Sequence, residues 1–344
     1  MTPVQQELLI AVVKVVVFFN IFLALFSGMT YVERRLLAFM QFRLGPNRVG
    51  PFGILQPVAD GIKLFFKEEV MPEGANKWAF VAAPALAIVT AFLAIAVVPY
   101  GPTVHLFGRD IPLQIADLDV GVLFLFAISS LGVYGIVMAG WAANNKYTLL
   151  GGLRSSAQMF SYELALGMSW VGAIILAGSF RISDIVASQA GPWGILHWNF
   201  LRQGLGFLVY LVAATAEVNR TPFDLPEAET ELVAGFHTEY SSMRFALLQM
   251  AEYVNMMTVA AVGASLFFGG WLAPLPALQH VFGHDIGLLW FLLKTGAGLF
   301  FFIWLRGTVP RLRYDQLMHF GWKVLLPLAT LNILATAAWI AFIK

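Results

Sequence analysis

Long apolar segments alternate with short polar ones along almost the whole chain. Helical segments of about 20 apolar residues cross the ~30 Å hydrocarbon core of a bilayer. The pattern therefore predicts an all-α, polytopic membrane protein with about eight transmembrane helices. They are expected at about residues 8–31, 78–99, 120–142, 157–178, 203–217, 245–269, 286–306 and 323–343. The fifth is short, and Glu252 and Lys294 interrupt the sixth and seventh, so we expect these three to pack inside the bundle.

Composition supports this assignment. Hydrophobic residues make up 59% of the chain and charged residues 12%, whereas soluble domains carry about 25% charge. The 344 residues leave no room for a separate soluble domain, so a single integral membrane domain over residues 1–344 is expected. The sequence MTPVQQE lacks a basic region, which favours a retained first span over a signal peptide. A net charge of +1 gives no indication of nucleic-acid binding.

Basic residues gather in alternate loops. Those after the first, third, fifth and seventh spans contain most of the Lys and Arg, whereas the opposite loops contain only Arg109, Arg181 and Arg202. By the positive-inside rule, the basic loops face the cytoplasm and both termini lie outside.

The first basic loop contains a candidate surface helix at about residues 54–68. Ile54, Val58, Ile62 and Phe65 recur at helical spacing, and this predicts an amphipathic helix along the membrane. It could dock with snorkelling lysines or rim an entrance for a lipid-like molecule, and the sequence does not separate these roles. Gly and Pro predict turns at residues 45–51, at 151–153 and around Pro222 and Pro226.

The chain offers no redox or metal centre. It has no Cys, which excludes disulfides, thiolate-bound iron–sulfur clusters and Cys-bound zinc within it. Its six histidines are scattered, and only His280 and His284 share an i, i+4 spacing, in a loop where solvation is expected. We therefore assign no FMN, iron–sulfur cluster, haem or metal to this chain, and any electron carrier must lie elsewhere.

Acidic residues at membrane depth are the better functional lead. Glu163, Glu217 and Glu252 fall in apolar segments, where a charge costs at least ~2.5 kcal/mol on insertion scales. Burial favours the protonated form of a carboxyl group, so such groups can relay protons near neutral pH. The alternative is a structural ion pair, for example with Arg154 or Arg220, and both interpretations stay open.

The run AEVNRTPFDLPEAETELVAGFHTEY, at residues 216–240, carries six carboxylates. Asp224 and Arg220 flank one turn of it. The acids Glu227, Glu229 and Glu231 follow Pro226, which is typical of a helix start. Three acids within five residues also repel one another, as in a charge-sensitive mobile loop beside a binding cavity.

Several motifs together resemble one known family. They are ERR at 33–35, GPNRVGP at 45–51, DGIKLFFKE at 60–68, NNKYTLLGGLRSSAQMFSYE at 144–163, the acidic run at 216–240 and RYDQLMHFGWKVLLP at 313–327. Nearly end to end, the chain resembles the H subunit family of the proton-translocating NADH:quinone oxidoreductase, respiratory complex I, which is also called the NADH dehydrogenase subunit 1 family. Membrane subunits of energy-converting hydrogenases share part of the pattern.

This resemblance implies a subunit in the inner (plasma) membrane of a bacterium, with both termini periplasmic. It would enclose most of a tunnel for ubiquinone or menaquinone. Its partners would be membrane lipid, hydrophilic-arm subunits at the quinone site, and neighbouring small and antiporter-like membrane subunits. The quinone would be reduced by electrons from an iron–sulfur cluster in a partner.

The resemblance also assigns roles to residues at matching positions. Tunnel or entrance residues would be Glu33, Arg34, Arg43, Asp60 and Lys63. Residues that couple the quinone cavity to the proton path, many of them in a loop at about 216–244, would be Glu163, Glu217, Arg220, Asp224, Glu227, Glu229, Glu231, Glu239 and Glu252. None is expected to act as a catalytic nucleophile.

Two rival functions remain compatible with the residues themselves. A solitary cation/proton antiporter or channel would also bury acids in a helical bundle. A passive membrane anchor would use the same carboxylates only to hold partners. The extensive basic loops favour a multisubunit assembly over a solitary transporter.

Overall fold

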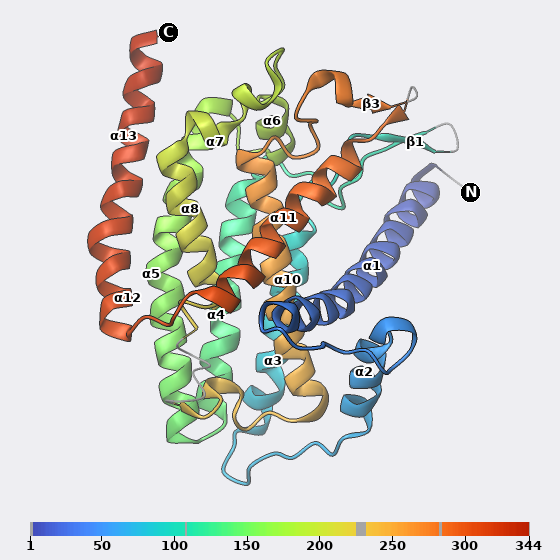
Figure 1. Cartoon of the computed structure of the whole chain (residues 1–344), viewed down its shortest axis with the longest axis vertical. Coiled ribbons are helices and arrows are strands. Elements are labelled where there is room, and N and C mark those ends of the chain that lie inside the picture. The colour runs from blue at the N-terminus through green and yellow to red at the C-terminus, as the bar shows by residue number, and fades with distance from the viewer. Residues whose placement is uncertain (1–2, 107–108, 225–231, 282–283, 344) are drawn as a thin grey trace.

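The chain forms one bundle of helices (Figure 1), and the computed structural model describes residues 3–106, 109–224, 232–281 and 284–343. The longer helices are α1 (Pro3–Met40), α3 (Lys77–Ile95), α4 (Gly121–Ala142), α5 (Lys146–Ala177), α8 (Gly204–Glu217), α10 (Ser242–Phe267), α11 (Gly287–Thr308) and α13 (Leu326–Ile343). The shorter ones are α2 (Gln56–Phe66), α6 (Ile182–Ala187), α7 (Asn199–Arg202) and α12 (Tyr314–Phe320), which the π-helical segment η5 (Gly321–Leu325) joins to α13. Single 3₁₀ turns are η1 (Pro51–Gly53), η2 (Gly194–His197), η3 (Gly235–His237) and η4 (Pro276–Leu278).

The predicted all-α membrane architecture is confirmed. Within the described residues, seven helices are long and apolar enough to cross a membrane, counting Tyr314–Phe342 as one. The fifth predicted span corresponds to α8, which has only 14 residues. Small antiparallel strand pairs interrupt two loops, and the sequence pattern did not predict them. They are β1 (Val104–Leu106) with β2 (Arg109–Ile111), and β3 (His280–Val281) with β4 (His284–Asp285).

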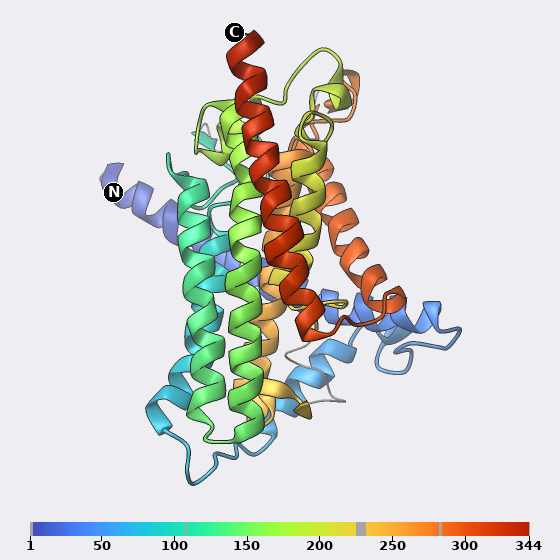
Figure 2. The same cartoon turned by 90° about the vertical axis from the view of Figure 1, so that its left-hand side faces the viewer.

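The bundle is built around α3, α4, α5 and α10. Helix α4 packs between α3 and α5, α10 packs on α3, and α8 packs on α5. Helices α1 and α13 lie on opposite flanks, and the ends of the chain point toward the same upper side in both views (Figures 1 and 2). Gln203 fixes α13, because it donates to Thr336 and accepts from Asn332 in a buried cluster.

The turn predicted at residues 151–153 is wrong, because these residues lie inside α5. The helix begins at Lys146, after Asn145 accepts a hydrogen bond from the backbone N–H of Tyr147 at 3.0 Å. A Cβ at Gly151 would lie 2.8 Å from the Cα of Gly235, so this glycine permits close approach of two backbones. Glycine here serves tertiary contact and not a turn.

We expect Gly140→Val to reduce sharply the amount of folded chain. A Cβ at Gly140 would lie 2.6 Å from the carbonyl oxygen of Thr148 and 3.0 Å from the Cα of Gly152. Because both are backbone atoms, α4 and α5 would have to separate, at a cost of about 1–3 kcal/mol or more. The measurement is the yield of protease-resistant chain in membranes. Gly296→Ala is the control, since nothing lies within 4 Å of its added Cβ, and equal yields would contradict the tight helix crossing.

Lys294 has a structural explanation. Its Nζ donates to the carbonyl oxygens of Phe268, Gly270 and Leu272 at 2.6, 2.8 and 2.5 Å, just beyond the carboxyl end of α10. It also lies 4.1 Å from the centroid of the Trp198 ring. A cation is favoured at a helix carboxyl terminus, where the dipole is negative. The expected packing inside the bundle holds for α10, whereas most of α11 is exposed or half-buried and only Gly287, Phe291, Phe302 and Ile303 are buried among its described residues.

Helix α2 coincides with most of the predicted surface helix. Val58, Ile62, Phe65 and Phe66 are exposed along it. An unpartnered apolar face of this kind is typical of helices that lie on a bilayer or on a partner. Its placement on the membrane surface and the single-domain organisation both stay predictions.

Candidate functional site

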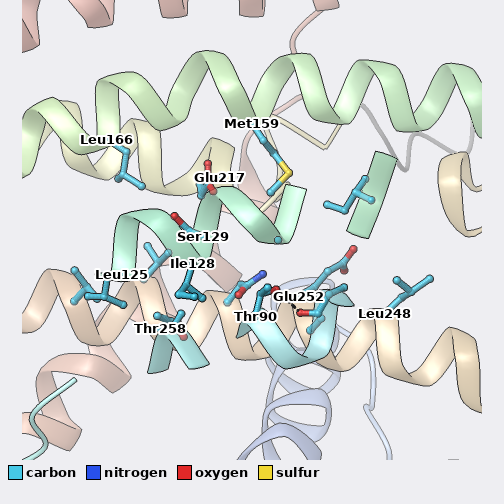
Figure 3. Close-up of a pocket in the computed structure, with 18 of the residues that line it drawn as sticks. Thr90, Leu125, Ile128, Ser129, Met159, Leu166, Glu217, Leu248, Glu252 and Thr258 are labelled. Carbon is cyan, nitrogen blue, oxygen red and sulfur yellow. Dashed lines mark hydrogen bonds between the residues drawn. The ribbon is translucent and has the colours of Figure 1, made fainter. Parts of the chain in front are cut away.

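A cavity of about 70 Å³ lies inside the bundle (Figure 3). Its walls come from α3, α4, α5 and α10, and Glu217 at the end of α8 also reaches it. The lining is mostly apolar, with a few polar groups that include Thr90, Ser129, Glu252 and Asn255. Since one water molecule needs about 10–15 Å³ of such space and two or more polar partners, the cavity has room for several waters. Glu217 and Glu252 both line this cavity.

Glu163 lies on α5 beside this cavity and is 4% exposed. It accepts hydrogen bonds from Ser130 and, at 3.4 Å, from Ser129, both on α4. The side chain of Arg154, one of the expected ion-pair partners, lies over the Tyr314 ring at 5.9 Å from its centroid. Serine hydroxyls can rotate and either donate or accept, so the contact suits a carboxyl group in both protonation states.

Glu217 is the most isolated of the three predicted acids. It is buried, and its Oε2 has no hydrogen-bond partner among the described residues. Glu163 is close enough to act on it electrostatically. A buried carboxyl oxygen without a partner is costly unless the group is protonated or water reaches it. The adjacent cavity can supply that water.

Glu252 faces the cavity from α10, and its carboxylate meets a histidine. The Nε2 of His237, in η3, lies 3.7 Å from Glu252 Oε1. No sequence pattern distinguishes His237 among six scattered histidines. Its contact with Glu252 joins two separate elements, η3 and α10, and helical periodicity relates only residues within one helix. The periodicity of α10 alone places Glu252 but not its neighbour.

A second charged cluster surrounds Glu33. Arg220 donates from Nη1 to Glu33 Oε1 at 3.1 Å, and Arg306 binds the same oxygen. The guanidinium of Arg220 lies 4.7 Å from the centroid of the Tyr253 ring. Burial is the largest single influence and opposes the charge on Arg220, but Glu33, Tyr253 and Glu252 together outweigh it and raise the pKa of Arg220 above its usual range. The structure thus joins a predicted tunnel residue to a predicted coupling residue.

Arg220 also has unused donors. Its Nε and Nη2 are buried and have no hydrogen-bond partner among the described residues. Buried polar groups in proteins are nearly always paired with protein, water or ligand. The site therefore suits an additional polar guest.

The other predicted entrance residues lie on the surface. Arg34 binds Asp60 at 2.5 Å and so joins α1 to α2. Arg43 is exposed and donates from Nε to Gln41 at 2.7 Å, and Lys63 is exposed on α2. Arg34, Asp60 and Lys63 thus lie on or against α2, outside the buried clusters, whereas Arg43 follows the end of α1.

The acidic segment is only partly described. Asp224 pairs with Arg311 at 3.0 Å, and Glu239 accepts a hydrogen bond from Asn145 at 2.6 Å. The predicted coupling residues Glu227, Glu229 and Glu231 lie outside the described residues. Sequence reasoning counted Arg306 and Arg311 only as basic loop residues, and it missed Tyr253, Ser129 and Ser130. Their partners lie 33 to 273 positions away along the chain, so no local signal reveals them.

These features define a polytopic helical membrane protein with titratable groups buried around an internal cavity. A family model described as NADH dehydrogenase matches residues 13–337. Similar proteins include H subunits of NADH-quinone oxidoreductase. Copy 1 from Geobacter metallireducens and copy 2 from Geobacter sulfurreducens are each 52% identical to the chain, over 100% of both sequences. The H subunit from Thermomicrobium roseum is 51% identical over 95% of each chain. The chain belongs to the NADH dehydrogenase family.

Proposed function

We propose that this chain is the membrane subunit that links quinone reduction to proton translocation in an NADH:quinone oxidoreductase. The names of the full-length relatives support membership of such an assembly. The observation that carries the proton-transfer role is the cavity that Glu217 and Glu252 both line. Ser129 also lines it and donates a hydrogen bond to Glu163. Acids at membrane depth that border a water-sized space are typical of proton paths.

The quinone, ubiquinone or menaquinone, is a substrate that reaches the chain from the lipid. The exposed apolar face of α2 and the polar groups Arg34, Arg43, Asp60 and Lys63 beside it support an entrance there. The buried Arg220, with two unused donors next to Glu33, supports a polar lining deeper inside. The electrons would come from an iron–sulfur cluster in a partner subunit, as the family resemblance implies, and the absence of Cys from this chain agrees with that.

The quinone site and the cavity that Glu217 and Glu252 line are coupled electrostatically. Quinone reduction adds negative charge, or withdraws protons, near residues 216–240. The carboxylates there respond by changing protonation. This changes the electrostatic potential at Arg220 and Glu252, which also act on each other. Protons then pass between Glu252, cavity water, Glu217 and Glu163, toward antiporter-like neighbours. The result is a coupling free energy between two sites within one assembly.

Hydrophilic-arm subunits would dock on the face that carries α2 and η3, which is the predicted cytoplasmic side. The ends of the chain point toward the opposite side of the bundle. This supports periplasmic termini in the inner membrane of a bacterium.

The proposal is tested by extracting the tagged chain from its native membrane with mild detergent and identifying the subunits that accompany it. A photoreactive quinone should also label this chain, with labelling suppressed by excess natural quinone. Ion flux through the purified chain alone in liposomes, with no accompanying redox subunits, would instead support the solitary antiporter.

A further inference from the structure

We propose that His237 transfers protons to and from Glu252 at one end of the cavity, so that an imidazole belongs to the proton path together with the carboxylates. This inference rests on the proposed function and extends it to a residue to which the family resemblance assigns no role. Its basis is the position of His237. The residue follows the acidic residues in the chain and contacts Glu252, which lines the cavity.

The contact between the two side chains is direct. His237 Nε2 lies 3.7 Å from Glu252 Oε1, and the exposed fractions of these side chains are 3% and 14%. A small rotation of either group would bring the atoms within the 2.7–3.2 Å of a hydrogen bond. Glu252 lines the cavity, so a proton placed on its carboxylate can reach cavity water.

The imidazole is held firmly in this position. Its ring centroid lies 3.9 Å from that of Phe236 and 5.7 Å from that of Phe245. The backbone of η3 packs closely on α5, where Gly151 has no side chain to keep it away. In Figure 1 this segment lies at the lower end of the bundle, where α10 begins. The ring therefore belongs to a turn, η3, whose neighbouring residue Phe236 lines the cavity.

Charged groups also lie on the elements that flank the pair. Glu252 faces His237 from α10, and Arg220 acts electrostatically on Glu252 from the cluster around Glu33. Glu239, two positions after His237, is held by Asn145 at the start of α5. Arg244, in the first turn of α10, is paired with Glu69. A change of charge in this neighbourhood would alter the balance of the proton between imidazole and carboxylate.

The transfer itself conserves atoms and charge. The Nε2–H bond of the imidazolium breaks, an O–H bond forms on Glu252, and a charged pair becomes two neutral groups. Nδ1 keeps its proton in the neutral ring, and the bare Nε2 is then the acceptor that can be protonated again. Histidine is suited to this step because it is a common proton shuttle in proteins.

The test uses His237→Asn and His237→Gln in the whole assembled complex. We expect quinone reductase and proton pumping to fall at least about tenfold, as for loss of a general acid–base group. The ionisation near neutral pH in the rate profile should disappear between about pH 5.5 and 8.5. Two variants are used because the Gln side chain is longer and offers an independent chance of assembly. Reduction of an artificial acceptor by the hydrophilic arm reports the amount assembled.

Phe245→Leu is the matched control, because it removes a ring packed on the imidazole but no titratable group. It should keep the wild-type pH profile even if the rate changes slightly. A purely structural His237 would give the opposite result, with normal profiles in both histidine variants once the rates are normalised to assembled enzyme. If those variants are normal while Glu252→Gln is inactive, this inference fails and the proposed function stands. If Glu252→Gln is also normal, both fail.

Discussion

Glu217→Gln is expected to remove most quinone reductase activity and proton pumping together. The substitution keeps the shape of the side chain but prevents ionisation at a buried position beside the cavity. A group that must gain and lose a proton cannot be replaced by an amide, so a loss of at least about tenfold is expected. The measurement compares quinone-linked NADH oxidation and proton uptake in membrane vesicles. NADH oxidation with an artificial acceptor should be unchanged, since it needs only the hydrophilic arm.

Glu73→Gln provides the matched control, since it makes the same chemical change on an exposed loop residue. Normal quinone-linked rates in a fully assembled Glu217→Gln complex would remove this residue from the proton path. Weakened assembly with normal turnover would favour the passive anchor instead. The corresponding variant Glu227→Gln is expected to act in the same direction.

Arg220→Met should destabilise the chain far more than removal of an exposed charge does. It removes one of the two cations on the buried carboxylate of Glu33 and leaves Arg306, which is 38% exposed, as the remaining partner. Breaking a buried ion pair by removing one member costs about 3–5 kcal/mol, because the other charge stays buried. The measurement is the temperature at which half of the assembled complex is lost in detergent.

Arg34→Met is the comparison, because Arg34 binds Asp60 in a pair whose arginine is 54% exposed. Pairs of that kind contribute about 0–1 kcal/mol. Equal thermal shifts for the two variants would show that the buried pair around Glu33 is not a main support of the structure.

The sequence predicted the helical membrane fold because apolar length is a local property of the chain. It placed α10 and α4 within a few residues of their observed bounds. It failed at residues 151–153, because glycine occurs both in turns and where two backbones approach closely. Only the tertiary contact with Gly235 shows that the second case applies here. It also failed to anticipate how Lys294 is accommodated, since the three carbonyl oxygens come from a loop more than 20 positions earlier.

The candidate site was predicted less completely than the fold. An isolated acid in an apolar segment is visible in the sequence, so Glu163, Glu217 and Glu252 could be selected. Their partners could not, and the same holds for Glu33, whose contacts with Arg220 and Arg306 span 187 and 273 positions. The resemblance to a family supplied roles for single residues. Which of these residues contact one another could be learned only from the structure, and these contacts determine the electrostatic environment of each charged group.

The side-chain amide of Asn145 makes two hydrogen bonds at the beginning of α5. The Oδ1 of Asn145 receives the Tyr147 N–H and so starts the helix, while its Nδ2 holds the Glu239 carboxylate. Neutralising Glu239 would weaken a hydrogen bond to a charged acceptor, which is about twice as strong as a neutral one. The first turn of α5 is therefore tied to the segment that carries Glu239, and Glu163 lies midway along the same helix.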